Sequence, residues 1–266
     1  MFSKSSRMTR VALFTASLLC IGQSQADVTA TPGVLKIGME ITYPPFESYD
    51  GDKVVGSDPE LIDAMAAHLG LKTQMLDTKF PNLIMGLNAG HYDAIISGMY
   101  ITPERQLQAQ TIPYAQAGAA ILVPKGSELK AQVPEDLCGH KIGLLQASIW
   151  VGKFRQLSTD YCLANNKGAI TVNEYPNSPE VTQALLSRNI EAQVEIGGAA
   201  QMIIKRTGGR VVIASDQLIY PQTLGIYVKK GNDATFQALT QALAQSKANG
   251  EYAAILKKYN LDAIPD

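Results

Sequence analysis

An arginine placed at the start of a helix is the residue in this sequence that most clearly points to binding chemistry. In the stretch SGMYITPER, residues 97–105, Thr102 has the features of a helix N-cap and Pro103 those of the first helical position. Arg105 then falls in the first turn, where the helix already carries partial positive charge. A cation there is unfavourable unless an anion lies nearby. The stretch therefore predicts an anion-binding site at Arg105.

No catalytic or cofactor motif accompanies this arginine. The sequence holds no G-x-S-x-G, no P-loop, no G-x-G-x-x-G and no H-E-x-x-H pattern. The pair Gly197-Gly198 favours a turn and a helix start over a phosphate site. The histidines His68, His91 and His140 are too scattered to indicate a metal site. We therefore expect a binding module with no catalytic residue, no cofactor and no metal.

Composition excludes several classes of partner. The chain has 266 residues, a formal net charge of -1 and 46% hydrophobic residues. This balance does not fit a nucleic-acid-binding protein or a cationic membrane protein, and the hydrophobic content is ordinary for a globular fold.

The N-terminus has the pattern of a secretory signal. Basic residues precede an apolar run at Val11–Ile21, and the small residues of a cleavage site follow at Ser24-Gln25-Ala26. The pattern predicts a signal peptide at residues 1–26 and an exported mature protein, and the family resemblance described below makes the periplasm the expected location. Cys20 raises the alternative of a lipoprotein, but the three residues before it fit a lipobox poorly.

Two cysteines, Cys138 and Cys162, remain after the signal is removed. In an oxidising compartment an even pair predicts a disulfide, which in the chain-entropy model stabilises a loop of this length by roughly 3–4 kcal/mol. A metal pair is the alternative, but it lacks close spacing and nearby histidines.

Short strand patterns alternate with helical patterns from Val34 onward, which predicts an α/β fold with mainly parallel strands. The helix patterns include SDPELIDAMAAHLG, with Asp58 as the expected N-cap, and SPEVTQALLSRN, with Ser178 as the expected N-cap. Expected strands include residues 34–40 and 92–97.

Two further apolar stretches, residues 117–127 and 220–231, look like crossings between two lobes. If they are antiparallel neighbours, the chain leaves a first lobe near residue 122 and returns near residue 222. This predicts lobe 1 at residues 27–121 plus 223–266, lobe 2 at residues 122–222, and a ligand cleft between them.

Five stretches carry a resemblance to a known family, and they are ITYPPFES, GSDPELIDAMAAHLG, NLIMGLNAGHYDAIISGMYITPER, DLCGHKIGLLQAS and LGIYVKKG. Together they resemble the periplasmic solute-binding proteins of amino-acid ABC transporters, bacterial extracellular solute-binding family 3. The resemblance covers essentially the whole mature chain. It implies a two-lobed periplasmic-binding-protein fold, with each lobe a mainly parallel sheet flanked by helices and two hinge strands between them.

The resemblance also implies roles for particular residues. Arg105 corresponds to the arginine that binds the ligand carboxylate, and Tyr43 to the aromatic residue that packs on the ligand. Ser148, next to Ile149, corresponds to a hydroxyl of the second lobe, and Glu40 to an acid that binds a side-chain cation. A solvated carboxylate at a strand end is the alternative for Glu40. Further amides for the anion are expected from Ser97, Gly98, Met99 and Tyr100.

Three departures from the family pattern put the ligand in doubt. Tyr100 replaces a small residue at the floor of the pocket, and Ile149-Trp150 replaces Thr-Gln at the rim. The family aspartate that binds the α-ammonium corresponds to Ile196, with Glu195 one position early. Either a bulge returns Glu195 to the pocket or the usual α-ammonium contact is absent. Because Glu195 is longer than aspartate, a third alternative is that it reaches a ligand amine placed differently.

These observations predict a binding component that delivers a small zwitterion to an inner-membrane ABC permease, with hinge closure over the ligand. A polar or basic α-amino acid, an ω-amino acid such as γ-aminobutyrate or 5-aminovalerate, and an opine are all candidates. A chemoreceptor is a further candidate partner, and we expect a monomer. The alternative on the same fold is a cyclohexadienyl dehydratase acting on prephenate or arogenate, in which Glu195 would be the general acid.

Overall fold

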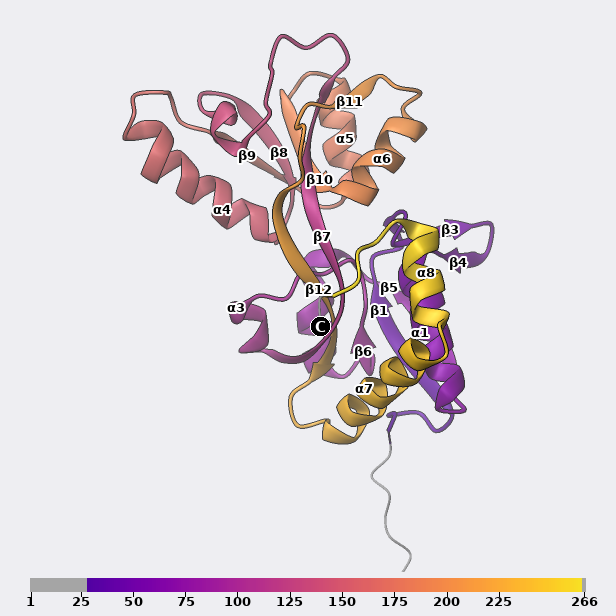
Figure 1. Ribbon diagram of the computed structural model, residues 1–266. Coiled ribbons are helices and arrows are strands. Elements are labelled where there is room, and N and C mark those ends of the chain that lie inside the picture. The colour runs from indigo at the N-terminus through magenta and orange to yellow at the C-terminus, as the bar shows by residue number, and fades with distance from the viewer. Residues whose placement is uncertain (1–27, 265–266) are drawn as a thin grey trace, which may run out of the picture.

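The computed structural model describes residues 28–264, so the signal peptide expected at residues 1–26, with Cys20, lies outside the described residues. The chain forms two lobes connected by two long strands (Figure 1). The predicted fold class is confirmed.

Lobe 1, as the structure arranges it, combines the N-terminal elements with the last two helices. Its strands are β1 (Val34–Met39), β2 (Thr42–Tyr43), β3 (Glu47–Asp50), β4 (Lys53–Val55), β5 (Lys72–Asp77) and β6 (Ala94–Ile95). Its helices are α1 (Ser57–His68), α2 (Leu83–Ala89), α3 (Pro103–Gln106), α7 (Asp233–Ala248) and α8 (Glu251–Tyr259), with a 3-10 turn at Phe80–Asn82.

Lobe 2 is formed by the middle of the chain. Its strands are β8 (Lys141–Leu145), β9 (Thr171–Tyr175), β10 (Ala192–Ile196) and β11 (Val211–Ile213). Its helices are α4 (Ile149–Leu157), α5 (Ser178–Leu186) and α6 (Gly197–Arg206), with a 3-10 turn at Pro134–Leu137 and a π-helical turn at Ser158–Leu163. No helix within residues 28–264 is long and apolar enough to cross a membrane.

The strands β7 (Ala109–Pro124) and β12 (Ile219–Lys229) run through both lobes as antiparallel neighbours (Figure 1). They join the parallel set β5-β1-β6 of lobe 1 to the parallel set β10-β8-β9 of lobe 2, so one sheet runs through the molecule. The two crossing strands are antiparallel neighbours as expected, but the contact lies mostly at residues 109–117 of β7, before the predicted stretch 117–127, whose residues 119–124 pair with β10 and β11. The lobe boundaries at residues 121/122 and 222/223 stay predictions.

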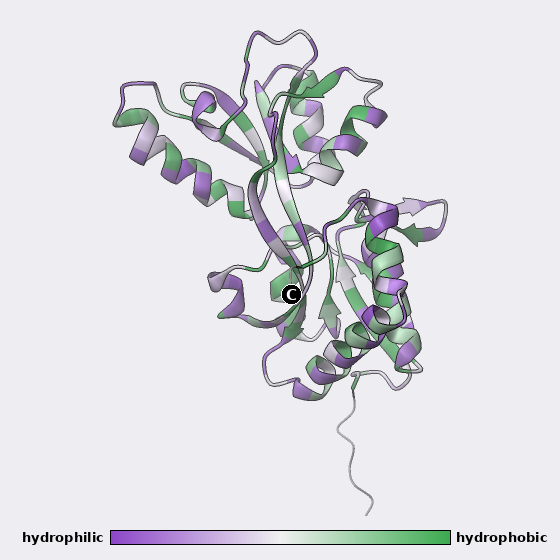
Figure 2. Cartoon of the chain, in the orientation of Figure 1, coloured by the Kyte–Doolittle hydropathy of each residue, from purple (hydrophilic) through white to green (hydrophobic). Residues whose placement is uncertain are grey.

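The core forms where apolar faces of helices cover these strands. Alternate residues of β1 are fully buried, and Leu61, Ile62 and Met65 of α1 pack in the same core. In Figure 2 the helices α4, α7 and α8 carry hydrophilic and hydrophobic residues interleaved along their length, as amphipathic helices do. Hydrophobic burial therefore holds each helix on its sheet and fixes the strand ends that face the cleft.

Two predicted helix caps are wrong. The cap of α1 is Gly56, and Asp58 lies inside the helix. The cap of α5 is Asn177, whose side chain accepts a hydrogen bond from the Glu180 amide, while Ser178 is the first helical residue. In both cases the predicted capping side chain bonds instead to a group distant in sequence, close to the cleft.

Candidate functional site

Arg105 is held between the two lobes. The cap of α3 forms as predicted, with the Thr102 hydroxyl accepting from the Arg105 amide at 3.2 Å. The guanidinium donates from Nη1 to the Tyr100 carbonyl at 2.7 Å and from Nη2 to the Ala147 carbonyl of lobe 2 at 3.0 Å. It also lies 5.4 Å from the centre of the Phe80 ring. These contacts orient the side chain across the cleft.

The charge of Arg105 lacks an anionic partner. The residue is only 9% exposed, and burial lowers its pKa from the usual arginine value. Among residues 28–264, no carboxylate forms an ion pair with it. Because a buried cation without a counterion is costly, this arrangement fits the predicted anion-binding site.

A small cavity of about 20 Å³ adjoins Arg105. It is lined by Tyr43, Phe80, Gly98, Tyr100, Arg105, Leu145, Ser148, Ile149, Trp150 and Ile196. Six of these residues were predicted as site residues, and they are Tyr43, Gly98, Tyr100, Arg105, Ser148 and Ile149. The volume suits about one water molecule, so a larger ligand requires the lobes to separate.

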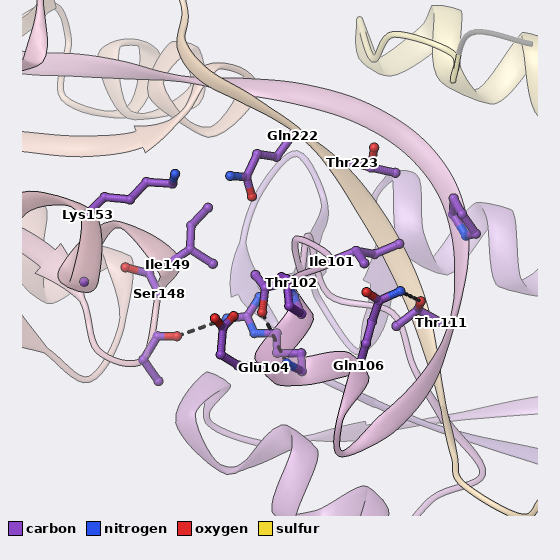
Figure 3. Close-up of a pocket in the computed structure, with 15 residues that line it drawn as sticks. Ile101, Thr102, Glu104, Gln106, Thr111, Ser148, Ile149, Lys153, Gln222 and Thr223 are labelled. Carbon is purple, nitrogen blue, oxygen red and sulfur yellow. Dashed lines mark hydrogen bonds between the residues drawn. The ribbon is translucent and has the colours of Figure 1, made fainter.

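A wide groove of about 940 Å³ continues from this cavity, and Arg105, Ser148 and Ile149 line both. Figure 3 shows the groove between two walls, with Thr102, Glu104 and Gln106 on one side and Ser148, Ile149 and Lys153 on the other. Ser148 caps α4 by position, yet its side chain makes no capping hydrogen bond. The groove gives the cavity a route to solvent between the lobes.

Tyr43 and Glu195 form a second contact across the cleft. The Tyr43 hydroxyl donates to Oε2 of Glu195 at 2.7 Å, and Oε1 accepts from Ser178 at 2.6 Å and from Gln193 at 2.9 Å. Glu195 is fully buried, and this burial raises its pKa. Both carboxyl oxygens are therefore already occupied by the protein's own donors.

The strand that carries Glu195 is regular. Residues Gln193 to Ile196 pair one by one with Leu122 to Ala119 of β7, without a bulge. Glu195 and Ile196 thus point to opposite faces. Ile196 lines the small cavity and Glu195 does not. Of the two alternatives raised by the sequence, this geometry favours the one without an α-ammonium contact from Glu195.

Glu40 is buried at the end of β1, with 4% of its surface exposed, so the alternative of a solvated carboxylate is wrong. Burial, and then the charges of Asp77 and Glu195, raise the pKa of Glu40 to about 8. Its backbone amide donates to the Ser97 hydroxyl at 3.0 Å. Glu40 is absent from the lining of the small cavity but lies close enough to Glu195 to feel its charge.

In the segment from Ser97 to Met99, Gly98 lines the small cavity, whereas Ser97 and Met99 do not. The Ser97 hydroxyl donates to Glu47 at 2.7 Å, and the Gly98 amide donates to Asp58 at 2.7 Å. Met99 packs in a core cluster with Phe80 and Leu83. The amide of Gly98, expected to face the anion, is thus bound by Asp58.

Glu47 and Asp58 form a buried acidic pair beneath this segment, which the sequence analysis did not identify. Burial raises the pKa of Asp58 to about 6, and burial together with the Asp58 charge raises the pKa of Glu47. Tyr114 donates to both oxygens of Asp58 at 3.0 Å. The pair anchors the segment after β6, where Glu47 accepts from Ser97 and Asp58 accepts from Gly98.

Two lining residues were missed as site residues. Phe80 belongs to a turn after β5, and nothing in its local pattern marks it. Trp150 was noted only as a departure at the rim. It is 2% exposed, and its ring meets Tyr100 edge to face with centres 5.8 Å apart. The sequence signal that could have identified Trp150 as a site residue is its bulk, since it replaces the polar glutamine of the family pattern two positions after Ser148.

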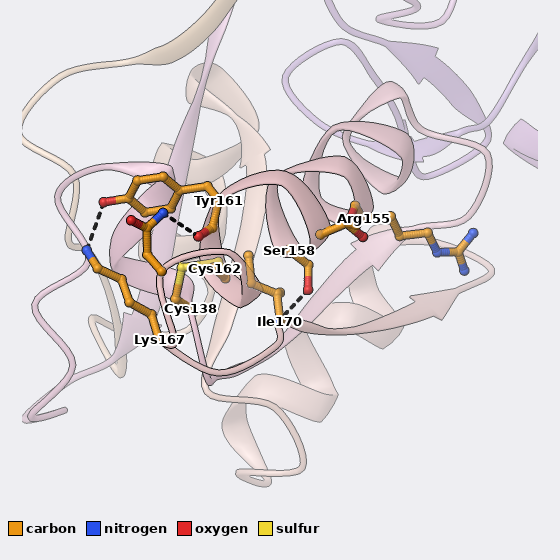
Figure 4. Close-up of a disulfide and its surroundings, with 9 residues drawn as sticks. Cys138, Arg155, Ser158, Tyr161, Cys162, Lys167 and Ile170 are labelled. Atoms are coloured by element: carbon orange, nitrogen blue, oxygen red, sulfur yellow. Dashed lines mark hydrogen bonds between the residues drawn. A yellow bond between two sulfur atoms is a disulfide. The ribbon is translucent and has the colours of Figure 1, made fainter.

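The predicted disulfide is confirmed: Cys138 and Cys162 are bonded, joining the end of one turn to another within lobe 2 (Figure 4). Neither cysteine lines the cavity or the groove. Among residues 28–264, no three His, Cys, Asp or Glu side chains gather closely enough to hold a metal ion.

Comparisons with known proteins agree with this geometry. The family model described as bacterial extracellular solute-binding proteins, family 3, matches residues 35–262. The L-cystine-binding protein TcyJ of Escherichia coli K12 is 29% identical over 232 residues, which are 85% of this chain and 82% of that protein.

Solved structures show the same fold. An ancestral arginine-binding protein bound to glutamine is 32% identical, with a TM-score of 0.77 over 86% of this chain and 98% of the other. The ancestral amino-acid-binding protein AncCDT-1, a precursor of cyclohexadienyl dehydratase, is 27% identical, with a TM-score of 0.73 over 85% of this chain and 95% of the other.

Proposed function

The chain belongs to the bacterial extracellular solute-binding proteins of family 3, and on that premise we propose that it is the periplasmic binding component of an ABC importer for a small amino acid or amino-acid derivative. The observation that carries the proposal is Arg105, a buried cation that bridges the lobes with no carboxylate partner among residues 28–264. A guanidinium matches a carboxylate in a two-bond geometry, and exclusion of water strengthens the pair.

The ligand's amine is proposed to lie away from the usual α-position. Ile196 lines the cavity where the family pattern has an aspartate, and Glu195 already accepts three hydrogen bonds. Glu40 is the remaining buried carboxyl near Glu195, and a bound cation would favour its ionised form. These features support a basic or ω-amino acid, or an opine, over a simple apolar α-amino acid.

Hinge closure is the proposed mechanism. Arg105 bonds to Ala147 across the cleft, and Tyr43 bonds to Glu195 across it, so both contacts break when the lobes separate. A ligand carboxylate at Arg105 adds contacts only when both lobes surround it, which shifts the population towards the closed form. The permease then distinguishes closed protein from open protein.

Thermal-shift screening of the mature chain tests this function. A true ligand stabilises the protein by mass action. The midpoint temperature of thermal unfolding should therefore rise with ligand concentration for one class among α-amino acids, ω-amino acids and opines. Arg105→Ala should abolish the rise. Arg155→Ala is the matched control, because Arg155 is exposed and forms its ion pair with Glu174, away from Arg105. Flat melting curves for the whole panel would contradict the proposal.

The dehydratase remains a second candidate because Glu195 is a buried carboxyl with a raised pKa. We propose that Glu195 instead holds the closed form, since its oxygens are bound to Ser178, Gln193 and Tyr43. Incubation with prephenate should produce no phenylpyruvate. Turnover that Glu195→Gln abolishes would establish the enzyme instead.

A further inference from the structure

Three buried polar atoms next to Arg105 have no hydrogen-bond partner among the described residues. They are the Tyr100 hydroxyl, the Ser148 hydroxyl and the indole nitrogen of Trp150. Tyr100 is 4% exposed and Trp150 2% exposed. All three residues line the same cavity of about 20 Å³. Unpartnered buried donors are rare in native proteins, and three around one cavity indicate a bound group that satisfies them.

The three groups share one chemical property, which is that each can donate a proton. The indole N–H can only donate, and the two hydroxyls are free to donate. No aspartate or glutamate lines the cavity, and Arg105 is its only charged residue. The lining therefore demands acceptor atoms from the ligand and offers no counterion for an amine.

The charge of the site limits what the acceptor can be. Arg105 neutralises one carboxylate. The Ser148 hydroxyl belongs to lobe 2, next in sequence to Ala147, whose carbonyl accepts from Arg105. A second buried carboxylate would have no cation, which is costly. Two uncharged donors, on Tyr100 and Trp150, instead suit an uncharged oxygen with two lone pairs.

We propose that Tyr100 and Trp150 form a specificity pair that binds a neutral carbonyl oxygen of the ligand, as in a carboxamide or ureido group, beside the carboxylate at Arg105. This inference rests on the proposed function and adds a neutral carbonyl group to the ligand that it describes. The two rings meet edge to face with centres 5.8 Å apart. Tyr100 comes from lobe 1 and Trp150 from α4 of lobe 2, so both donors reach one carbonyl only while the two lobes enclose the ligand, at a wider separation than the cavity of about 20 Å³ allows here.

The test compares ligands that differ in the carbonyl. The probes are L-glutamine and L-citrulline against L-norleucine, L-glutamine against L-glutamate, and glutaramate against hexanoate, which lacks the carboxamide. Trp150 is the only tryptophan of the chain, so its emission reports occupation of the site, and calorimetry gives the dissociation constants. We expect the carbonyl ligands to bind roughly tenfold or more tightly than their apolar partners, because two donors are otherwise left unpaired. Glutamate should bind more weakly than glutamine.

Variants separate a ligand contact from a structural role. Tyr100→Phe and Trp150→Phe should each weaken binding of the carbonyl ligand by roughly three- to tenfold more than binding of its apolar partner. The melting temperature of ligand-free Tyr100→Phe should not fall, since no described residue bonds to the hydroxyl. Tyr49→Phe, at a tyrosine that is 53% exposed, is the matched control.

The outcomes distinguish this inference from the proposed function. Equal affinity for carbonyl and apolar ligands, or an equal loss of both in Tyr100→Phe, would overturn the carbonyl pair and leave the binding function standing. The same holds if only ligands without a carbonyl bind. Failure of every carboxylate to bind, with no response to Arg105→Ala, would overturn both.

Discussion

At the scale of single residues, the site depends on charges that are held out of water. Arg105 keeps its charge because guanidinium groups do not deprotonate in proteins, whereas Glu40 sits in a place that favours its neutral form. One end of the proposed ligand therefore meets a permanent cation, and the other meets a carboxyl group whose charge depends on pH.

The affinity for an amine-bearing ligand should rise with pH if Glu40 is the amine's partner. Because the pKa of Glu40 in the free protein is about 8, only the ionised minority binds the cation below that pH. Affinity should then rise roughly tenfold per pH unit from pH 6 to pH 7 and level off above pH 8. Calorimetry across this range measures it, and Glu40→Gln should give a flat profile with weaker binding. An equally steep profile in Glu40→Gln would assign the dependence to another group.

Glu40 should also make the ligand-free protein less stable at high pH. Its pKa is raised from the ordinary 4.5 to about 8, so between these values the folded state binds more protons than the unfolded state. The free energy of unfolding therefore decreases as pH rises from about 4.5 to about 8. Glu40→Gln removes this contribution and should be more stable than wild type at pH 8 by roughly a few kcal/mol at most. Urea unfolding of wild type and variant at pH 5 and pH 8 measures the difference. Asp58 and Glu47 also have raised pKa values, but both proteins contain them, so their contribution cancels in the comparison.

At the scale of elements, short caps and strand ends place the functional groups. The predicted start of α3 was correct because its signals, a threonine followed by proline, act locally. The predicted caps at Asp58 and Ser178 were wrong because their side chains bond to Gly98 and Glu195, which are distant in sequence. Local patterns could not reveal those partners.

The same limit explains what was missed in the site. The strand expected at residues 92–97 reduces to β6, because Ser97 and Gly98 turn away to contact Glu47 and Asp58. Phe80 joins the site only through folding of the turn after β5. By contrast, Arg105 and Tyr43 were found because their surrounding motifs are contiguous in the sequence.

Loss of the α3 cap should weaken both the helix start and the site. The Thr102 hydroxyl accepts from the backbone of Arg105 itself, so Thr102→Ala frees the residue that carries the guanidinium. We expect a loss of about 1 kcal/mol in the free energy of unfolding, with weaker ligand binding. Denaturant titration and calorimetry measure the two effects. Thr102→Ser keeps the acceptor and should behave like wild type; a loss as large as that in Thr102→Ala would mean that the methyl group matters instead.

At the scale of the whole molecule, stability and binding are carried by different regions. The disulfide lies within lobe 2 and neither cysteine lines the cavity or the groove, while the contacts that close the cleft come from both lobes. Changes that loosen lobe 2 as a body and changes that open the cleft should therefore have separable effects.

Removing the disulfide tests this separation. Cys138→Ser combined with Cys162→Ser should lower the free energy of unfolding by roughly 3–4 kcal/mol in the chain-entropy model. The dissociation constant of the ligand, measured well below the unfolding transition, should stay unchanged. Weaker binding by the fully folded double variant would instead show that the disulfide helps to position α4 at the cleft.

The return of the chain through β12 has a consequence for biogenesis. β12 pairs with both β6 and β7, and α7 and α8 pack on α1 after it, so lobe 1 lacks a central strand and two covering helices until the C-terminal part is present. Lobe 2 instead comes from one uninterrupted stretch. As the polypeptide is synthesised N-terminus first, lobe 2 can fold while the half that carries Arg105 still lacks β12, α7 and α8. The protein's earliest segment is thus among its last to be completed.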